Sequence, residues 1–220
     1  MQKLLLLLFI PSSIICLFYG TTDLPDGDAE MLCATQAGFD IGRDLSDELK
    51  SDYSRIPKGL WYRIRDQIRR ISYDASESIL RHDDPQRQGN CYFQVESNME
   101  TEYIQSIPFP RASSMSAPYN YYFSALMNDN NNGIHISLEW YDDENKLMNS
   151  TSIHSIDTMN TSNVSRLNEA KLGKIVPDAK TMLIRIITDS SLSTSENTSY
   201  FIDMINVVFF PDHIFNSGRP

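Results

Sequence analysis

Residues 134–141 alternate apolar and polar side chains, which places one set in a core and the other set on the opposite face of a strand. If the apolar set that ends at Trp140 is buried, His135, Glu139 and Tyr141 share the outer face. A tyrosine offers a flat apolar surface, and glutamate and histidine offer hydrogen bonds, so this face can hold a small polar ligand. The ordinary outer face of a half-buried sheet has the same pattern, and both interpretations stay open.

Two further residues are expected to join this face from neighbouring strands. Tyr122 lies in the alternating segment 119–127, and Arg185 lies in the apolar segment 180–189. Arginine adds hydrogen-bond donors in a fixed plane. The predicted ligand set is Tyr122, His135, Glu139, Tyr141 and Arg185.

Common catalytic motifs are absent from the sequence, including Gly-x-Ser-x-Gly, His-Glu-x-x-His and a glycine-rich phosphate loop. The paired acids Asp83-Asp84 and Asp142-Asp143 lie in turn-like segments. A general acid and base need an enclosed site, which turns do not supply. The sequence therefore predicts a protein that is not an enzyme.

The first twenty residues have the pattern of an export signal. Lys3 precedes an apolar run at 4–9, and a second run follows at 14–18 after Pro11. Each run is shorter than the about 20 residues that span a bilayer. We expect a signal peptide at 1–20, a secreted extracellular protein and no membrane span, with a lipoprotein signal through Cys16 as the weaker alternative.

Removal of the signal leaves two cysteines, Cys33 and Cys91. In an exported protein they are most simply one disulfide, which contributes about 4 kcal/mol in the chain-entropy model. Two separate buried thiols are the alternative. Neither cysteine has a His or Cys at metal-ligand spacing, so a metal bound by this pair is not expected.

Four sequons predict N-glycosylation at exposed positions in a eukaryotic host, namely Asn149, Asn160, Asn163 and Asn197. The chain is acidic, with a formal net charge of −10, which disfavours binding to nucleic acid or anionic membranes. One basic cluster stands out, and it either meets an acidic partner or is a solvated face. Its members are Arg63, Arg65, Arg69 and Arg70.

The remaining patterns predict a single all-β domain. Short segments rich in β-branched and aromatic residues alternate with turn clusters such as 128–133, which is typical of a sandwich or barrel. Apart from the segments already described, strands are expected at 91–96, 102–108 and 200–210. Segment 44–84 is ambiguous, because its apolar spacing fits two short helices while 61–65 and 69–74 also fit strands.

A series of short motifs resembles the jelly-roll carbohydrate-binding modules of the galactose-binding-like superfamily, often attached to bacterial glycoside hydrolases. The similarity covers roughly residues 33–210, in family order. The motifs are Ala37-Gly38-Phe39-Asp40, Pro57-Lys58-Gly59-Leu60-Trp61, Gly89-Asn90-Cys91-Tyr92, Tyr103-Ile104-Gln105, Tyr122-Phe123-Ser124-Ala125, Trp140-Tyr141-Asp142, Val176-Pro177-Asp178-Ala179 and Tyr200-Phe201-Ile202-Asp203.

The resemblance implies an antiparallel jelly-roll β-sandwich at 33–210, followed by a tail at 211–220. It makes segment 44–84 a long connection with strands and at most short helical turns. Family members often hold a structural calcium ion, and the matching positions here are Asp40 and Asp203. The sequence departs from the family pattern at two places: Asp40 replaces the usual Glu of the first motif, and Ile202 replaces the first Asp of the last motif. The implied function is binding of a glycan or other ligand. The alternatives are a secreted protein-interaction or structural domain without a sugar site and, more weakly, an uncharacterised hydrolase.

Overall fold

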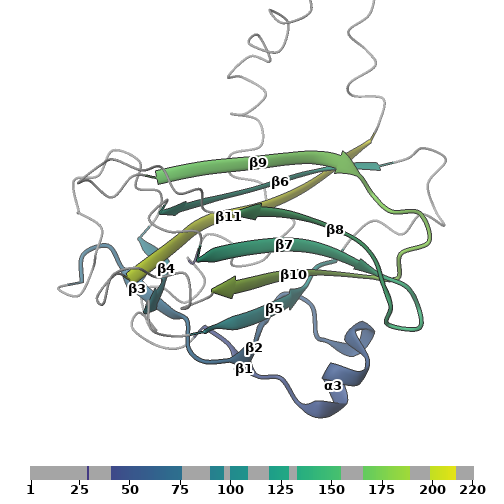
Figure 1. Ribbon diagram of the computed structural model, residues 1–220, viewed down its shortest axis with the longest axis horizontal. Coiled ribbons are helices and arrows are strands. Elements are labelled where there is room, and N and C mark those ends of the chain that lie inside the picture. The colour runs from purple at the N-terminus through teal and green to yellow at the C-terminus, as the bar shows by residue number, and fades with distance from the viewer. Residues whose placement is uncertain are drawn as a thin grey trace, which may run out of the picture.

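The computed structural model describes Ala29 and residues 41–75, 90–96, 100–108, 119–128, 133–154, 166–188 and 199–211. Within these ranges the chain is almost entirely β-strand, and the strands form two sheets that face each other (Figure 1). The predicted all-β jelly-roll sandwich is confirmed.

The first sheet has six strands within the described residues, in the order β1-β2-β5-β10-β7-β8. All its neighbours pair antiparallel except β1 and β2, which are parallel. The strands are β1 (Arg43–Asp44), β2 (Trp61–Arg65), β5 (Glu102–Ser106), β7 (Ile134–Tyr141), β8 (Leu147–His154) and β10 (Thr181–Thr188).

The second sheet has five strands within the described residues, in the order β3-β4-β11-β6-β9, all antiparallel. They are β3 (Arg69–Ser72), β4 (Cys91–Glu96), β6 (Tyr119–Asn128), β9 (Arg166–Lys174) and β11 (Ser199–Pro211). Strands next to each other in the sequence often lie in different sheets, so each sheet depends on contacts between distant parts of the chain.

The main core lies between the two sheets and follows the predicted alternation. Ile134, Ile136 and Leu138 of β7 point into it at 0% exposure. The two tryptophans anchor it, with Trp140 at 1% and Trp61 at 3% exposure. The remaining side chain of each alternating pair must therefore point out of the sandwich.

Segment 44–75 contains strands and two short helical turns, as the resemblance implies. Ser46 caps α3 (Asp47–Ser51) by accepting from the Leu49 N–H at 3.4 Å, and Asp52 caps η1 (Tyr53–Arg55) by accepting from the Ser54 N–H at 3.0 Å. The apolar spacing of segment 44–84 favours helices, but residues 61–65 form the strand β2 because they pair with β5.

Three strands, β1, β8 and β9, lie outside the predicted ones. β8 reads Leu147–His154 and has one fully buried residue, Ile153, so it lacks the apolar alternation that marks a half-buried strand. β8 pairs with β7 and β9 pairs with β6, each at the end of its sheet. An end strand can remain polar because it has a neighbour on one side only, so more of its side chains meet solvent. No helix in the described ranges is long and apolar enough to cross a membrane.

Candidate functional site

The outer face of the six-stranded sheet brings together side chains from β5, β7 and β10. The antiparallel register of β10 and β7 sets Arg185 opposite Ser137, and β10 pairs on its other side with β5, where Arg185 lies opposite Ile104. Residues two apart on a strand share a face, so Glu139 and Tyr141 project from the same side as Ser137. The sheet therefore places three of the predicted ligand residues within reach of one another.

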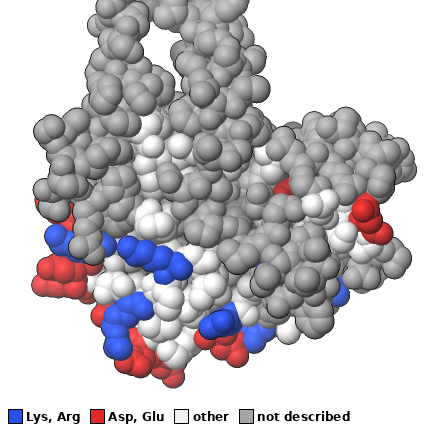
Figure 2. Space-filling model, turned by 180° about the vertical axis from the view of Figure 1, so that it is seen from behind, with Lys and Arg blue, Asp and Glu red and all other residues white. Residues whose placement is uncertain are grey.

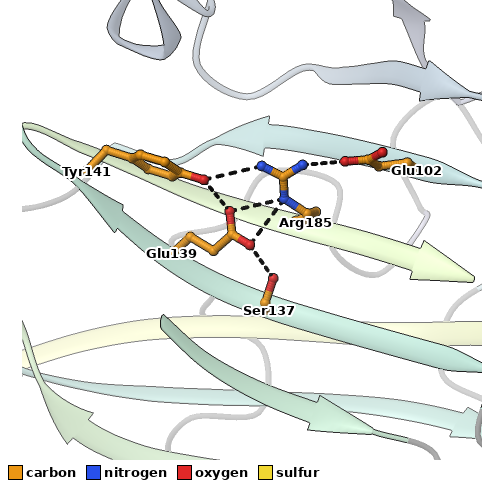
Figure 3. Close-up of polar contacts among 5 residues, drawn as sticks. All are labelled: Glu102, Ser137, Glu139, Tyr141 and Arg185. Carbon is orange, nitrogen blue, oxygen red and sulfur yellow. Dashed lines mark hydrogen bonds and ion pairs between the residues drawn. The ribbon is translucent and has the colours of Figure 1, made fainter. Parts of the chain in front are cut away.

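Arg185 is the centre of a hydrogen-bonded network on this face (Figure 3). Its Nε donates to both carboxylate oxygens of Glu139, at 3.1 Å each. One terminal nitrogen forms an ion pair with Glu102, and the other donates to the Tyr141 hydroxyl at 3.2 Å. Glu139 also accepts from the Tyr141 hydroxyl at 2.6 Å and from Ser137 Oγ at 2.9 Å. The network fixes the guanidinium plane and both carboxylates.

The charges of this network are mostly buried. The exposed fraction of the side chain is 13% for Arg185, 11% for Glu139 and 21% for Glu102. Burial opposes the charge of Arg185, but the Glu139 carboxylate and the hydroxyls of Tyr53 and Tyr141 raise its pKa. Burial also raises the pKa of Tyr141, and its bond to Glu139 acts in the same direction. Arg185 is therefore a cation, and Tyr141 a neutral donor, at physiological pH.

Segment 45–56, which contains α3 and η1, covers one end of this face. Tyr53 packs edge-on against Tyr141, with ring centroids 5.0 Å apart. The Tyr53 N–H donates to Asn145 Oδ1 at 3.1 Å, and Asn145 has a positive φ of 63° in the turn after β7. A satellite core lies beneath the segment, made of Leu45, Ile56, Tyr62, Ile104, Tyr141 and Leu183. Tyr141 is 6% exposed, so this covered end leaves its ring little access to a ligand.

The opposite, open end of the face carries a histidine pair. His135 of β7 lies opposite His154 of β8, with ring centroids 4.3 Å apart. Ser152 Oγ lies 3.0 Å from His154 Nε2. His135 is half-buried and His154 is exposed. Burial, followed by the nearby His154, lowers the pKa of His135, while the Glu139 charge opposes this shift. His135 is therefore a neutral imidazole at neutral pH.

Four of the five predicted ligand residues share this face, and the fifth does not. His135, Glu139, Tyr141 and Arg185 belong to the six-stranded sheet, whereas Tyr122 belongs to β6 of the other sheet. The predicted convergence of Tyr122 with the others is therefore wrong. β6 and β7 are consecutive strands, but the chain crosses from one sheet to the other between them, which the alternation within each strand cannot reveal.

The predicted ligand set also lacks several residues of the face, among them Tyr53, Glu102 and His154. Glu102 begins β5, and the pairing of β5 with β10 brings it to Arg185. Tyr53 reaches the face from the covering segment. His154 ends β8, and its position opposite His135 depends on the strand register. The alternation of Ser150, Ser152 and His154 is the one local signal that could have found it.

Asp203, predicted as a calcium ligand, is fully buried in β11. Its Oδ2 accepts from the Tyr73 hydroxyl at 2.5 Å, and its Oδ1 accepts from the Met204 N–H at 2.8 Å. Met204 has a positive φ of 50°, where the register with β6 shifts. Asp40 lies outside the described residues, so its convergence with Asp203 and the calcium ion stay predictions.

The predicted disulfide and glycosylation sites lie only partly within the described residues. Cys91 is fully buried and disulfide-bonded, but Cys33 lies outside the described residues, so the Cys33–Cys91 pairing stays a prediction. Asn149 is exposed on β8, which is compatible with glycosylation. The other three sequons lie outside the described residues.

The predicted basic cluster is divided by ion pairs. Arg63 Nε donates to Asp44 at 2.7 Å, and Arg65 pairs with Glu100 at 2.7 Å. Arg70 is 4% exposed and so is not part of a surface patch. Seen from behind, basic and acidic groups lie beside one another on the described surface (Figure 2). The cluster is therefore not an open site for an acidic partner.

No family model and no curated protein matches the chain. Among solved structures, the chain is similar to the enzymatically active domain of tailspike protein 4 from bacteriophage CBA120, with 11% identity and a TM-score of 0.44. This match covers 86% of this chain and 21% of that chain, so the present chain spans about a fifth of the length of that domain.

Carbohydrate-binding modules, which the sequence resembles, are also among the similar structures. A family 61 module in complex with β-1,4-galactotriose has 14% identity and a TM-score of 0.40, over 78% of this chain and 100% of that chain. A family 4 module has 15% identity and a TM-score of 0.40, over 74% and 92%. At these scores the likeness carries no argument about what this chain binds, and the fold assignment rests on the two sheets described above.

Proposed function

We propose that this chain is a secreted, non-enzymatic module that binds carbohydrate on the outer face of its six-stranded sheet. The observation that carries the proposal is the Arg185 network, which holds donors and acceptors in fixed positions beside an exposed rim. A sugar presents hydroxyls that both donate and accept hydrogen bonds. Groups fixed before binding lose little further entropy when the ligand arrives.

The strand register places an apolar side chain between the polar groups at the open end. Ile187 lies opposite Glu102 on one side and opposite His135 on the other, and it is half-buried. An apolar C–H surface of a sugar can pack on Ile187 while its hydroxyls bond to Glu102 and His135. The proposed ligand therefore lies over this row and away from Tyr141.

The same network argues for binding without catalysis. Glu102 and Glu139 both contact the guanidinium of Arg185, and Glu139 also accepts from Ser137 and Tyr141. Glycoside hydrolysis needs one carboxyl group that releases a proton to the leaving group. It also needs a second that either attacks the anomeric carbon of the sugar or activates a water molecule. Glu102 and Glu139 already accept from the fixed Arg185 cation. They are therefore better suited to hydrogen-bonding sugar hydroxyls than to acting as a proton donor or a nucleophile.

A glycan array with the exported chain in Ca²⁺ tests the proposal, followed by calorimetry on the best ligand. We expect Glu102→Gln and His135→Ala each to lower affinity about tenfold, because a hydrogen bond to a charged group contributes about 1.5–3 kcal/mol and a neutral one about 1 kcal/mol. Lys50→Gln, which breaks an exposed ion pair within α3 and away from the open end, is the matched control. Failure to bind any glycan would overturn the proposal.

An extracellular protein partner is the second candidate, and a specific surface favours it. Leu147 and Met148 of β8 are 48% and 40% exposed, and Leu172 of β9 is 57% exposed. β8 lies against β9, so these apolar groups belong to neighbouring end strands. If glycans do not bind, Leu172→Lys and Met148→Lys should weaken capture of an extracellular partner and leave the melting temperature unchanged.

The proposed structural calcium ion has its own test. The resemblance and the full burial of Asp203 support it. An ion that binds only the folded state stabilises it by about 2.7 kcal/mol at a hundredfold excess over its dissociation constant. Thermal unfolding with Ca²⁺ and then with chelator measures this effect. If the chelator leaves the melting temperature unchanged, the calcium ion is removed from the proposal.

A further inference from the structure

The histidine pair at the open end has the geometry of two metal ligands on adjacent strands. His135 and His154 are directly opposite in the register of β7 and β8, so their side chains leave the sheet at the same place and on the same face. Their ring centroids are 4.3 Å apart, and the ring planes are tilted by 55°. A tetrahedral zinc ion with Zn–N distances of about 2.0–2.1 Å needs two nitrogens roughly 3.3 Å apart. Rings at this separation reach that spacing by small side-chain rotations.

The surroundings of His135 favour a neutral imidazole. Burial and the proximity of His154 lower the pKa of His135, which keeps its ring uncharged and able to donate a lone pair at neutral pH. Ser152 Oγ lies 3.0 Å from His154 Nε2, where it can accept a hydrogen bond from the ring N–H. This contact would orient the His154 ring, in the way that second partners orient metal-bound histidines.

We propose that His135 and His154 form a surface site for a divalent transition metal ion, with water completing the coordination shell. No three His, Cys, Asp or Glu side chains lie close enough to share an ion within the described residues, which supply two ligands here. The exposure of His154 leaves room for the waters. Imidazole suits Zn²⁺, Cu²⁺ and Ni²⁺, and Cu²⁺ should bind most tightly of the three. This site does not depend on the proposed carbohydrate function.

Calorimetric titration of the full chain, prepared without a histidine tag, tests the site with ZnCl₂ and CuCl₂ as probes. At pH 7.4 we expect one ion per chain, tighter for Cu²⁺ than for Zn²⁺, and at least about tenfold weaker binding in His135→Asn and in His154→Asn. At pH 5 binding should disappear, because protons compete for both imidazoles. His154 is exposed, so His154→Asn should fold normally and remains informative if His135→Asn is destabilised.

The chain offers a matched control in its two other histidines, His82 and His213. The double variant His82→Asn/His213→Asn should keep the native affinity for Zn²⁺. Imidazole proton resonances of His135 and His154 should shift together as Zn²⁺ is added. Unchanged binding in His154→Asn, or loss of binding in the control variant, would overturn the proposal. Sugar binding that survives without metal would leave the carbohydrate function intact and separate the two proposals.

Discussion

The two ends of the outer face on the six-stranded sheet are built from the same strands but have different surroundings. At the covered end, Tyr53 from the 45–56 segment packs on Tyr141, which becomes 6% exposed. At the open end, His154 is exposed and His135 is half-buried. Both ends have the alternation that places polar side chains outside the sandwich. The comparison shows that an outward-pointing residue meets solvent only where no other part of the chain covers it.

Arg185 links the two ends, and its loss should have the largest effect. Arg185→Met leaves Glu102 and Glu139 in a mostly buried setting without their common cation. Removal of one partner from a buried ion pair costs about 3–5 kcal/mol. Urea denaturation measures the change, and Arg185→Met combined with Glu139→Gln should recover part of it. A loss below about 1 kcal/mol would mean that water reaches both carboxylates.

Asn145 binds the covering segment through the Tyr53 N–H, so its replacement should weaken the packing of the covered end alone. Asn145→Ala removes the acceptor for the Tyr53 N–H and places alanine at a positive φ of 63°. Each effect costs about 1 kcal/mol, so we expect a loss of about 1–2 kcal/mol in the free energy of unfolding. Asn145→Gly tolerates the backbone angle and should cost less. Equal losses in both variants would show that the backbone angle contributes little.

A smaller, pH-dependent effect is expected at the open end. The folded protein lowers the pKa of His135, so the unfolded chain binds more protons as pH falls below about 6.5. Stability should therefore be highest above that pH and should fall as pH drops through the folded pKa. The charged or titratable groups that face His135 from β7, β8 and β10 are Glu139, His154 and Arg185, with Glu102 beyond Ile187 on β5.

Denaturation between pH 5 and pH 8 checks this sign. His135→Asn should flatten the profile over this range. His154→Asn should reduce the slope without removing it, because burial of His135 remains the larger cause. If the free energy of unfolding of the native protein increased toward acid pH, this would contradict the assignment of His135 as a neutral imidazole.

The smallest effect is expected for an exposed ion pair that takes no part in the Arg185 network. Arg65 and Glu100 form a 2.7 Å pair whose side chains are 57% and 50% exposed. An exposed pair of this kind contributes about 0–1 kcal/mol. Arg65→Gln should therefore change the denaturation midpoint little, and less still at 1 M salt, where exposed charges are screened. A loss as large as that of Arg185→Met would show that exposure does not distinguish the two ion pairs.

Much of the fold follows from patterns within single strands. The alternation of β7 gives Ile134, Ile136 and Leu138 to the core, and the aromatic and β-branched segments become β4, β5, β6, β10 and β11. These predictions hold because a strand's period of two is a local property of the backbone. β1, β8 and β9 were not predicted because their place at the ends of the sheets lets them remain polar.

The sequence by itself determined which side chains point out of the sandwich, and the tertiary structure decided what those side chains meet. Tyr122 alternates as Tyr141 does, but it lies in the other sheet because the chain changes sheets between β6 and β7. Glu102 reaches Arg185, and His154 reaches His135, through strand pairings across 83 and 19 positions of the chain. Alternation reports the direction of a side chain along its own strand. Register, sheet order and the position of a covering segment depend on the free energy of the whole fold, which no local pattern contains.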